Sequence, residues 1–267
     1  MKTDKVLFAA AVTAMVAVSI SFFLNFLTHG SVANAAEIKV LSAVALRPVL
    51  SELSGEFERS TGHKLMFGYD TAGAVKNRIQ RGESADLAIT TAPQVEELVK
   101  QGNIAADGRV IVAKVGVGVA VRSGAAKPDL GSVEAFKRSM LAAKSVIYAD
   151  PAGGGAAGIH FAQVLERLGI AADMKPKSKL IKSLNTAELV AKGEGELGVT
   201  QISLIVGAPG VELAGALPAE LQHYTVFSAG VVANAKEGEA ARALIKFLSG
   251  PAAAHVIKTQ GMEPGTP

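Results

Sequence analysis

The chain has 267 residues, a formal net charge of +3, no cysteine and no tryptophan. The lack of cysteine excludes disulfides, thiolate metal sites and a lipidated cysteine anchor, and a chain of this length can bury a core without such links. The near-neutral charge balance disfavours a nucleic-acid partner, which would require a basic patch. The scattered histidines show no metal-ligand spacing. We therefore expect neither a metal nor a cofactor.

The N-terminus has the pattern of a secretory signal. Lys2 and Lys5 precede an uncharged run over residues 6–28, and residues 33–35 read Ala-Asn-Ala. We expect cleavage after this triplet, so that residues 1–35 form a signal peptide and the remainder acts in the periplasm. An uncleaved N-terminal anchor is the alternative, because roughly 20 apolar residues can also span a membrane.

The rest of the chain alternates short β-type runs with amphipathic helical patterns. In chain order, the expected strands are 37–41, 64–69, 85–90, 110–121 (one strand or two), 145–149, 197–201 and 225–233. The expected helices are about 46–57, 72–81, 93–102, 133–142, 157–168, 186–191, 238–248 and 251–259. This alternation predicts an α/β fold of mainly parallel sheets with helices on both faces. The sequence has no obvious linker, which favours lobes joined by crossing strands.

Small residues gather where strands lead into helices, at 42–47, 70–74 and 151–158. Free backbone N–H groups and the positive end of the helix dipole favour an anion at such helix starts. Any single junction is explained as well by the tight turns of an α/β fold, but the repetition in one chain favours an anion site. The segment 153–158 matches neither a phosphate loop nor a dinucleotide-binding loop. A nucleotide-dependent enzyme is therefore disfavoured.

Charged side chains near these junctions are candidates for ligand contact or catalysis. Arg47 could pair with a carboxylate ligand or lie solvated in the first helical turn. Asp70 suits a helix cap or, in the sharper interpretation, a general base. His160 suits either a place in the cleft or a partly buried structural position.

Neutral hydrogen-bond donors near the expected strand ends form a second group of candidates, namely Ser42, Thr71, Ser183 and Gln201. Such donors suit an oxyanion held in a dry cleft, because hydrogen bonds to charged groups are the stronger ones. Each residue is also an ordinary polar loop residue in many folds.

Several segments resemble bacterial molybdate-binding proteins, the solute-binding components of ABC importers. The resemblance is carried by 38–46 (IKVLSAVAL), 57–62 (FERSTG), 71–74 (TAGA) and 82–87 (GESADL). It extends through 150–151, 157–159, 197–199 and 247–253, and thus over nearly all of the predicted mature chain.

The resemblance implies a type II periplasmic-binding-protein fold, in which two α/β lobes hold the ligand between them. Lobe one would comprise 36–118 plus 228–267, and lobe two 119–227. It also implies a monomer that closes on a small anionic ligand and is recognised by an ABC permease in the inner membrane.

The ligand positions depart from the family pattern. Ala45 and Ala72, the latter beside Thr71, stand where the family offers hydroxyl donors, and Gln201 replaces a tyrosine. The resemblance implies contacts through backbone N–H groups near Ala157 and Ser183. The complete set of expected ligand-binding residues is Ser42, Ala45, Arg47, Thr71, Ala72, Ala157, Ser183 and Gln201. Because each lost charge-assisted bond removes roughly 1.5–3 kcal/mol, a small organic acid is an alternative to a molybdate- or tungstate-like oxyanion.

The preferred function is capture of a small anion for an ABC importer by hinge closure. The alternative is a periplasmic aconitate isomerase, because bacterial enzymes of that kind resemble the same family. Such a cofactor-independent isomerase would need a base, for which Asp70 and His160 are the candidates. A third possibility is an anchored sensor lobe, should the first segment remain uncleaved.

Overall fold

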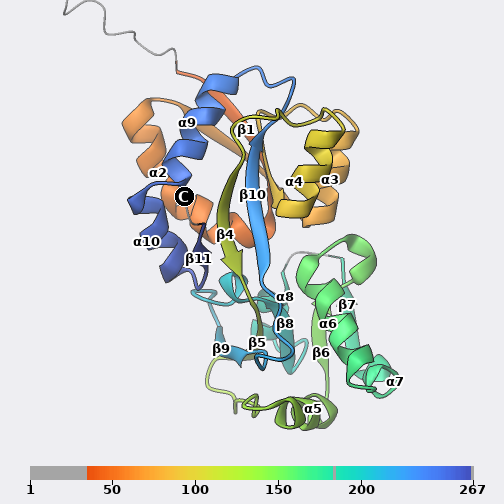
Figure 1. Ribbon diagram of the computed structural model, residues 1–267. Helices are drawn as coiled ribbons and strands as arrows, with labels where there is room; N and C mark the ends of the chain where they lie inside the picture. The colour runs from red at the N-terminus through yellow and green to blue at the C-terminus, as the bar shows by residue number, and fades with distance from the viewer. Residues whose placement is uncertain (1–34, 183–184, 266–267) are drawn as a thin grey trace, which may run out of the picture. The chain divides into compact units, whose positions relative to one another are not determined.

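The computed structural model describes residues 35–182 and 185–265. The predicted signal peptide, apart from its last residue, lies outside the described residues, as does Ser183. Among the residues described, no helix combines the length and the apolar character needed to cross a bilayer. The strands of the described part form two sheets, and helices lie against both (Figure 1).

The first sheet has the strand order β11-β4-β10-β3-β1-β2. Its strands are β1 (Glu37–Ala43), β2 (Lys64–Asp70), β3 (Leu87–Thr91), β4 (Val110–Val115), β10 (Thr225–Val231) and β11 (Glu263–Pro264). β1 runs parallel to β2 and β3, whereas β10 is antiparallel to both β3 and β4. Because β1, β2 and β3 are parallel, their carboxyl ends lie at the same edge of the sheet.

Helices cover both faces of the first sheet. On one face lie α2 (Arg47–Thr61), α9 (Gly238–Leu248) and α10 (Pro251–Thr259), and on the other lie α3 (Ala72–Gln80) and α4 (Ala92–Lys100) (Figure 1). α2 buries Val49, Leu50, Leu53 and Phe57, a spacing that places them on one helical stripe. The helix ends at Gly62, whose φ of +77° suits a left-handed cap.

The second sheet has the order β7-β6-β8-β5-β9. Its strands are β5 (Val117–Arg122), β6 (Val146–Ala149), β7 (Ser178–Ile181), β8 (Leu197–Gln201) and β9 (Val211–Ala216). α5 (Val133–Ala142) and α6 (Ala156–Arg167) pack on one face, next to α7 (Ala171–Met174), and α8 (Thr186–Ala191) packs on the other. β6 is parallel to β7 and β8, while β5 is antiparallel to β8 and β9.

The chain passes between the sheets at Gly116, which separates β4 from β5, and again between β9 and β10. Gln222, in the second passage, links the two passages. Its side chain accepts a hydrogen bond from Val117 N at 2.8 Å and donates one to Val117 O at 2.9 Å. The expected two-lobed α/β architecture is confirmed. Both sheets are mixed rather than mainly parallel. β10 is antiparallel to β3 in the first sheet, and β5 is antiparallel to β8 in the second.

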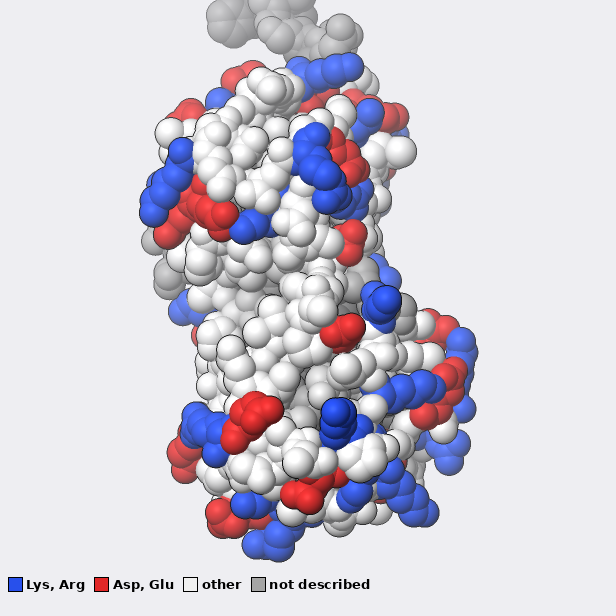
Figure 2. All heavy atoms as spheres, turned by 90° about the vertical axis from the view of Figure 1, so that its right-hand side faces the viewer, with Lys and Arg blue, Asp and Glu red and all other residues white. Residues whose placement is uncertain are grey.

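Charges of both signs are intermixed on the face that carries α3, α4, α6 and α7. Figure 2 shows Lys, Arg, Asp and Glu over both ends of this face, with a mostly uncharged band between them. This face presents no broad region of a single sign that would attract a polyanion.

Candidate functional site

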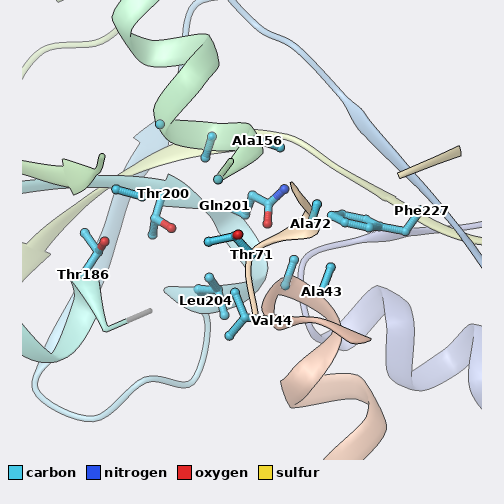
Figure 3. Close-up of a pocket in the computed structure, with 15 residues that line it drawn as sticks. Ala43, Val44, Thr71, Ala72, Ala156, Thr186, Thr200, Gln201, Leu204 and Phe227 are labelled. Carbon is cyan, nitrogen blue, oxygen red and sulfur yellow. The ribbon is translucent and has the colours of Figure 1, made fainter. Parts of the chain in front are cut away.

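A small cavity of about 40 Å³ lies where turns from both sheets meet (Figure 3). The described residues that line it are mostly small and uncharged: Ala43, Val44, Ala45, Thr71, Ala72, Ala149, Gly155, Ala156, Ala157, Gly158, Thr186, Thr200, Gln201, Leu204 and Phe227. None of these lining residues carries a charged side chain.

The first wall follows β1. The strand ends at Ala43, a 3-10 turn takes Val44–Leu46, and α2 begins at Arg47 with a proline in its first turn. The leading N–H groups of such a turn have no partner within it. Ser203, in the 3-10 turn Ile202–Leu204 that follows β8, donates its hydroxyl to Ala45 O at 2.9 Å. This bond fixes the first wall against the second sheet's part of the molecule.

The second wall is the start of α3. Thr71 is its N-cap, and its Oγ1 accepts a hydrogen bond from Ala74 N at 3.1 Å. The same hydroxyl donates to Gly153 O at 2.6 Å, across from the other sheet. The only hydroxyl proton of Thr71 is thereby used, so this side chain acts in the structure as a link between walls rather than as a free donor.

The third wall is the start of α6, whose N-cap is Gly155. Gly158 lies in the first turn, and a Cβ there would come within 2.1 Å of Ala149 O, so only glycine fits. This close approach seats the first turn of α6 directly on the end of β6. The leading N–H groups of a helix of this length, with the positive end of its dipole, favour an anion.

Gln201 supplies the one amide side chain among the described residues that line the cavity. It ends β8, is only 5% exposed, and its Nε2 has no hydrogen-bond partner among the described residues. An unpaired buried amide is costly, so its N–H groups call for an acceptor in the cavity. Figure 3 shows the side chain among the lining residues, between Thr200 and Ala72.

A second cavity, of about 320 Å³, shares Thr186, Thr200 and Leu204 with the first. Arg47 and Glu188 are the charged residues among its described lining. Glu188 is paired with Lys192 at 2.5 Å, and this hydrogen bond, with smaller contributions from Asn185 and Arg47, lowers the pKa of the Glu188 carboxyl. Glu188 is therefore an ionised, already compensated group.

The structure brings together Ala45, Thr71, Ala72, Ala157 and Gln201 around the first cavity and places Arg47 in the second. Ser42 does not line either of these cavities: it is fully buried, and its hydroxyl donates to Ala43 O at 3.1 Å. Side chains alternate along a strand, so the residue before the end of β1 faces the interior instead of the turn.

Asp70 and His160, the candidate bases, do not line the first cavity. Asp70 Oδ1 accepts from Thr71 N at 2.8 Å, and Oδ2 lies 3.8 Å from Arg78 Nη1. His160 Nε2 bonds to Leu221 O at 2.7 Å. Burial lowers the pKa of His160, so the ring is neutral near pH 7. Both side chains have structural partners that hold them in place.

Thr186, Thr200 and Phe227 are lining residues that sequence reasoning did not single out. Thr186 is the first residue of α8, and Asn185 holds the N-cap position before it. Thr200 precedes Gln201 on a strand that was correctly located, so position at a strand's carboxyl end was the available signal. Among the described residues, no cluster of three or more His, Cys, Asp or Glu could hold a metal ion.

Comparison with known proteins gives consistent matches. The family model for bacterial extracellular solute-binding proteins matches residues 38–263. An aconitate isomerase of a Pseudomonas species is 32% identical over 233 residues, which cover 85% of this chain and 87% of that protein. The molybdate-binding protein ModA of Azotobacter vinelandii is 31% identical over 245 residues, covering 86% of this chain and 90% of that protein.

A solved structure, the periplasmic molybdate-binding protein of Azotobacter vinelandii, superposes with a TM-score of 0.73. The sequence identity is 22%, and the match covers 84% of this chain and 98% of that chain. At this identity the likeness concerns the fold.

Proposed function

The chain belongs to the bacterial extracellular solute-binding protein family, and from this premise we propose that it captures a small anion in the first cavity and delivers it to an ABC importer. The matches confirm the expected likeness to molybdate-binding proteins and make this a solute-binding protein of that type. The nature of the solute, the importer and the periplasmic location belong to the proposal.

The unpaired Nε2 of Gln201 is the observation that carries the proposal. A buried amide nitrogen without an acceptor is explained if an anion accepts its hydrogen bond when bound. The leading N–H groups at Val44 and Ala156 add donors from both sheets. Neutral donors of this kind hold an anion without a cationic side chain in the cavity.

The size of the cavity supports a compact anionic group. One water-sized sphere needs about 10–15 Å³. A cavity of about 40 Å³ therefore has room for about three atoms or groups of that size. A carboxylate or an oxyanion is of this order.

The arrangement also suggests how capture is signalled. A ligand that touches both walls only when they are close favours the closed state, which is a shift of population between conformations. We assign the lobes to 36–118 with 228–267 and to 119–227. In this proposal the monomeric protein, released from residues 1–35 in the periplasm, presents its closed form to the permease.

Calorimetry of the purified protein with molybdate, tungstate, sulfate, phosphate, citrate and cis-aconitate tests the proposal. At least one anion should bind, and Gln201→Ala should weaken it by about 10- to 100-fold through the loss of a charge-assisted bond. Gln163→Ala, at an exposed position of α6, is the matched control and should leave affinity unchanged. Absence of binding by every anion, or an unaffected Gln201→Ala variant, would contradict the proposal.

Aconitate isomerisation is the second candidate, because the Pseudomonas relative of that name is 32% identical to most of this chain. We rank it below binding, because no described residue that lines the first cavity has a titratable side chain to move a proton. Proton NMR of cis-aconitate incubated with the protein tests it. Formation of trans-aconitate would support an enzyme, and an unchanged cis signal would support binding alone.

A further inference from the structure

The first cavity adjoins the second. Thr186, Thr200 and Leu204 line both, so these three residues lie between the two spaces. Figure 3 shows Thr186 and Thr200 at the opposite end of the first cavity from Phe227. The second cavity, of about 320 Å³, is the larger of the two, and a ligand seated against Gln201 would lie beside the residues that the cavities share.

The second cavity contains a cation without a fixed partner. Arg47 makes no salt bridge or hydrogen bond with any residue in the described part of the chain. Glu188 on the same cavity is paired with Lys192 and interacts with the exposed Arg47 only at longer range, so the guanidinium keeps its hydrogen-bond donors available. A planar guanidinium is well matched to a carboxylate, which it can bind through paired hydrogen bonds.

The chain itself ties Arg47 to the first cavity. Val44 and Ala45 line that cavity, and Arg47 follows them directly as the first residue of α2. The position of the guanidinium is thus linked to the same turn that presents backbone N–H groups to the first site. The two groups that favour an anion, Gln201 and Arg47, thus line adjoining cavities.

We propose that both cavities form a single site for a small organic acid with at least two carboxylates, one held by Gln201 and the helix starts and the other by Arg47. The inference rests on the proposed function and deepens it. A lone tetrahedral oxyanion would fill only the first cavity and leave Arg47 unused. A di- or tricarboxylate uses both cavities, and its carbon chain lies beside the shared residues Thr186, Thr200 and Leu204.

Calorimetry with molybdate, acetate, succinate and tricarballylate tests this assignment. Succinate or tricarballylate should bind at least 10-fold more tightly than acetate, which can occupy only one end. Arg47→Ala should weaken succinate or tricarballylate by about 10- to 100-fold while changing molybdate or acetate by less than twofold. Arg47→Lys should retain part of the affinity, because it keeps the charge but not the planar fork.

Arg59→Ala, which removes an exposed arginine from the last turn of the same helix, is the matched control and should change none of these affinities. If succinate and tricarballylate bind no better than acetate, or Arg47→Ala weakens every probe equally or none, the two-ended site is wrong. Binding of molybdate or acetate that depends on Gln201 would then leave the proposed function standing. If none of these four probes binds, the two-ended site is wrong, while the proposed function is decided by the wider set of anions given above.

Discussion

The backbone N–H of Gly73 donates to the carbonyl oxygen of Gly154 at 3.2 Å, joining the start of α3 to the turn before α6. The two residues belong to parts of the chain built on different sheets. A Cβ on Gly73 would lie 3.0 Å from Gly154 Cα and 3.3 Å from its oxygen, so one of the two backbone segments would have to shift by a few tenths of an ångström. At this point the backbone of the α3 start contacts the backbone of the turn before α6 directly.

Gly73→Ala tests whether this contact supports ligand capture. Alanine favours the helix by about 1 kcal/mol over glycine, so the variant should remain folded. The added methyl group should hold the two walls apart and weaken the anion that binds to wild type by about 10-fold, without touching it. Calorimetry measures the affinity.

Gly55→Ala is the matched control, because that glycine is also helical and its Cβ would meet only the flexible end of the Arg59 side chain, at 3.1 Å. It should keep the wild-type affinity. Equal affinity of Gly73→Ala and wild type would show that the contact between Gly73 and Gly154 has no part in closure.

Thr71 should contribute to stability, because its hydroxyl makes two hydrogen bonds. Thr71→Val removes the cap of α3 and leaves Ala74 N and Gly153 O without their partner, which should lower the free energy of unfolding by about 1–3 kcal/mol. Thr71→Ser keeps the hydroxyl and should stay within about 0.5 kcal/mol of wild type. Urea unfolding gives the free energies, and a Thr71→Val variant as stable as wild type would contradict the role.

Local pattern predicted much of the fold. The apolar spacing at Val49, Leu53 and Phe57 predicted a helix over about 46–57, and α2 runs over Arg47–Thr61, because helix periodicity is a short-range property. The antiparallel return of β10 was missed, because the direction of a strand in a sheet depends on contacts distant in the sequence. The mixed sheets follow from that return.

The candidate site was predicted less completely. Small residues at helix starts pointed to the turns near Ala45, Ala72 and Ala157, which do lie around the cavity. The hydroxyl of Thr71 donates to the carbonyl oxygen of Gly153, which is 82 positions away, and a local sequence pattern does not predict such a contact. The link from Arg47 to the second cavity likewise arises from packing, since α8 and β8 supply the opposite wall. Ligand contact by these residues stays a prediction.

Gly158→Ala should destabilise the protein because its Cβ would come within 2.1 Å of Ala149 O, a backbone atom that cannot rotate away. Overpacking of this kind costs about 1–3 kcal/mol, and the shifted start of α6 should also weaken anion binding. Gly153→Ala is the control in the neighbouring turn, since nothing lies within 4 Å of its Cβ position. Urea unfolding of both variants compares the sites; a Gly158→Ala variant as stable as Gly153→Ala would show that the backbone relaxes freely.

His160 should make stability depend on pH below neutrality. Burial lowers its pKa from the usual 6.5, His223 and Arg167 oppose its protonation further, and the bond to Leu221 O only partly offsets these effects. The unfolded chain therefore takes up a proton at higher pH than the folded chain does. The contribution of His160 to stability is complete above about pH 6.5 and is lost as the pH falls toward the folded pKa.

The free energy of unfolding should consequently fall between pH 7 and pH 5 by more in wild type than in His160→Gln. Urea unfolding at a series of pH values measures both slopes. His255→Gln, at an exposed position of α10, is the matched control and should keep the wild-type slope. If His160→Gln also keeps that slope, another group causes the loss of stability in acid. The pKa of His160 would then not be lowered by folding, contrary to this prediction.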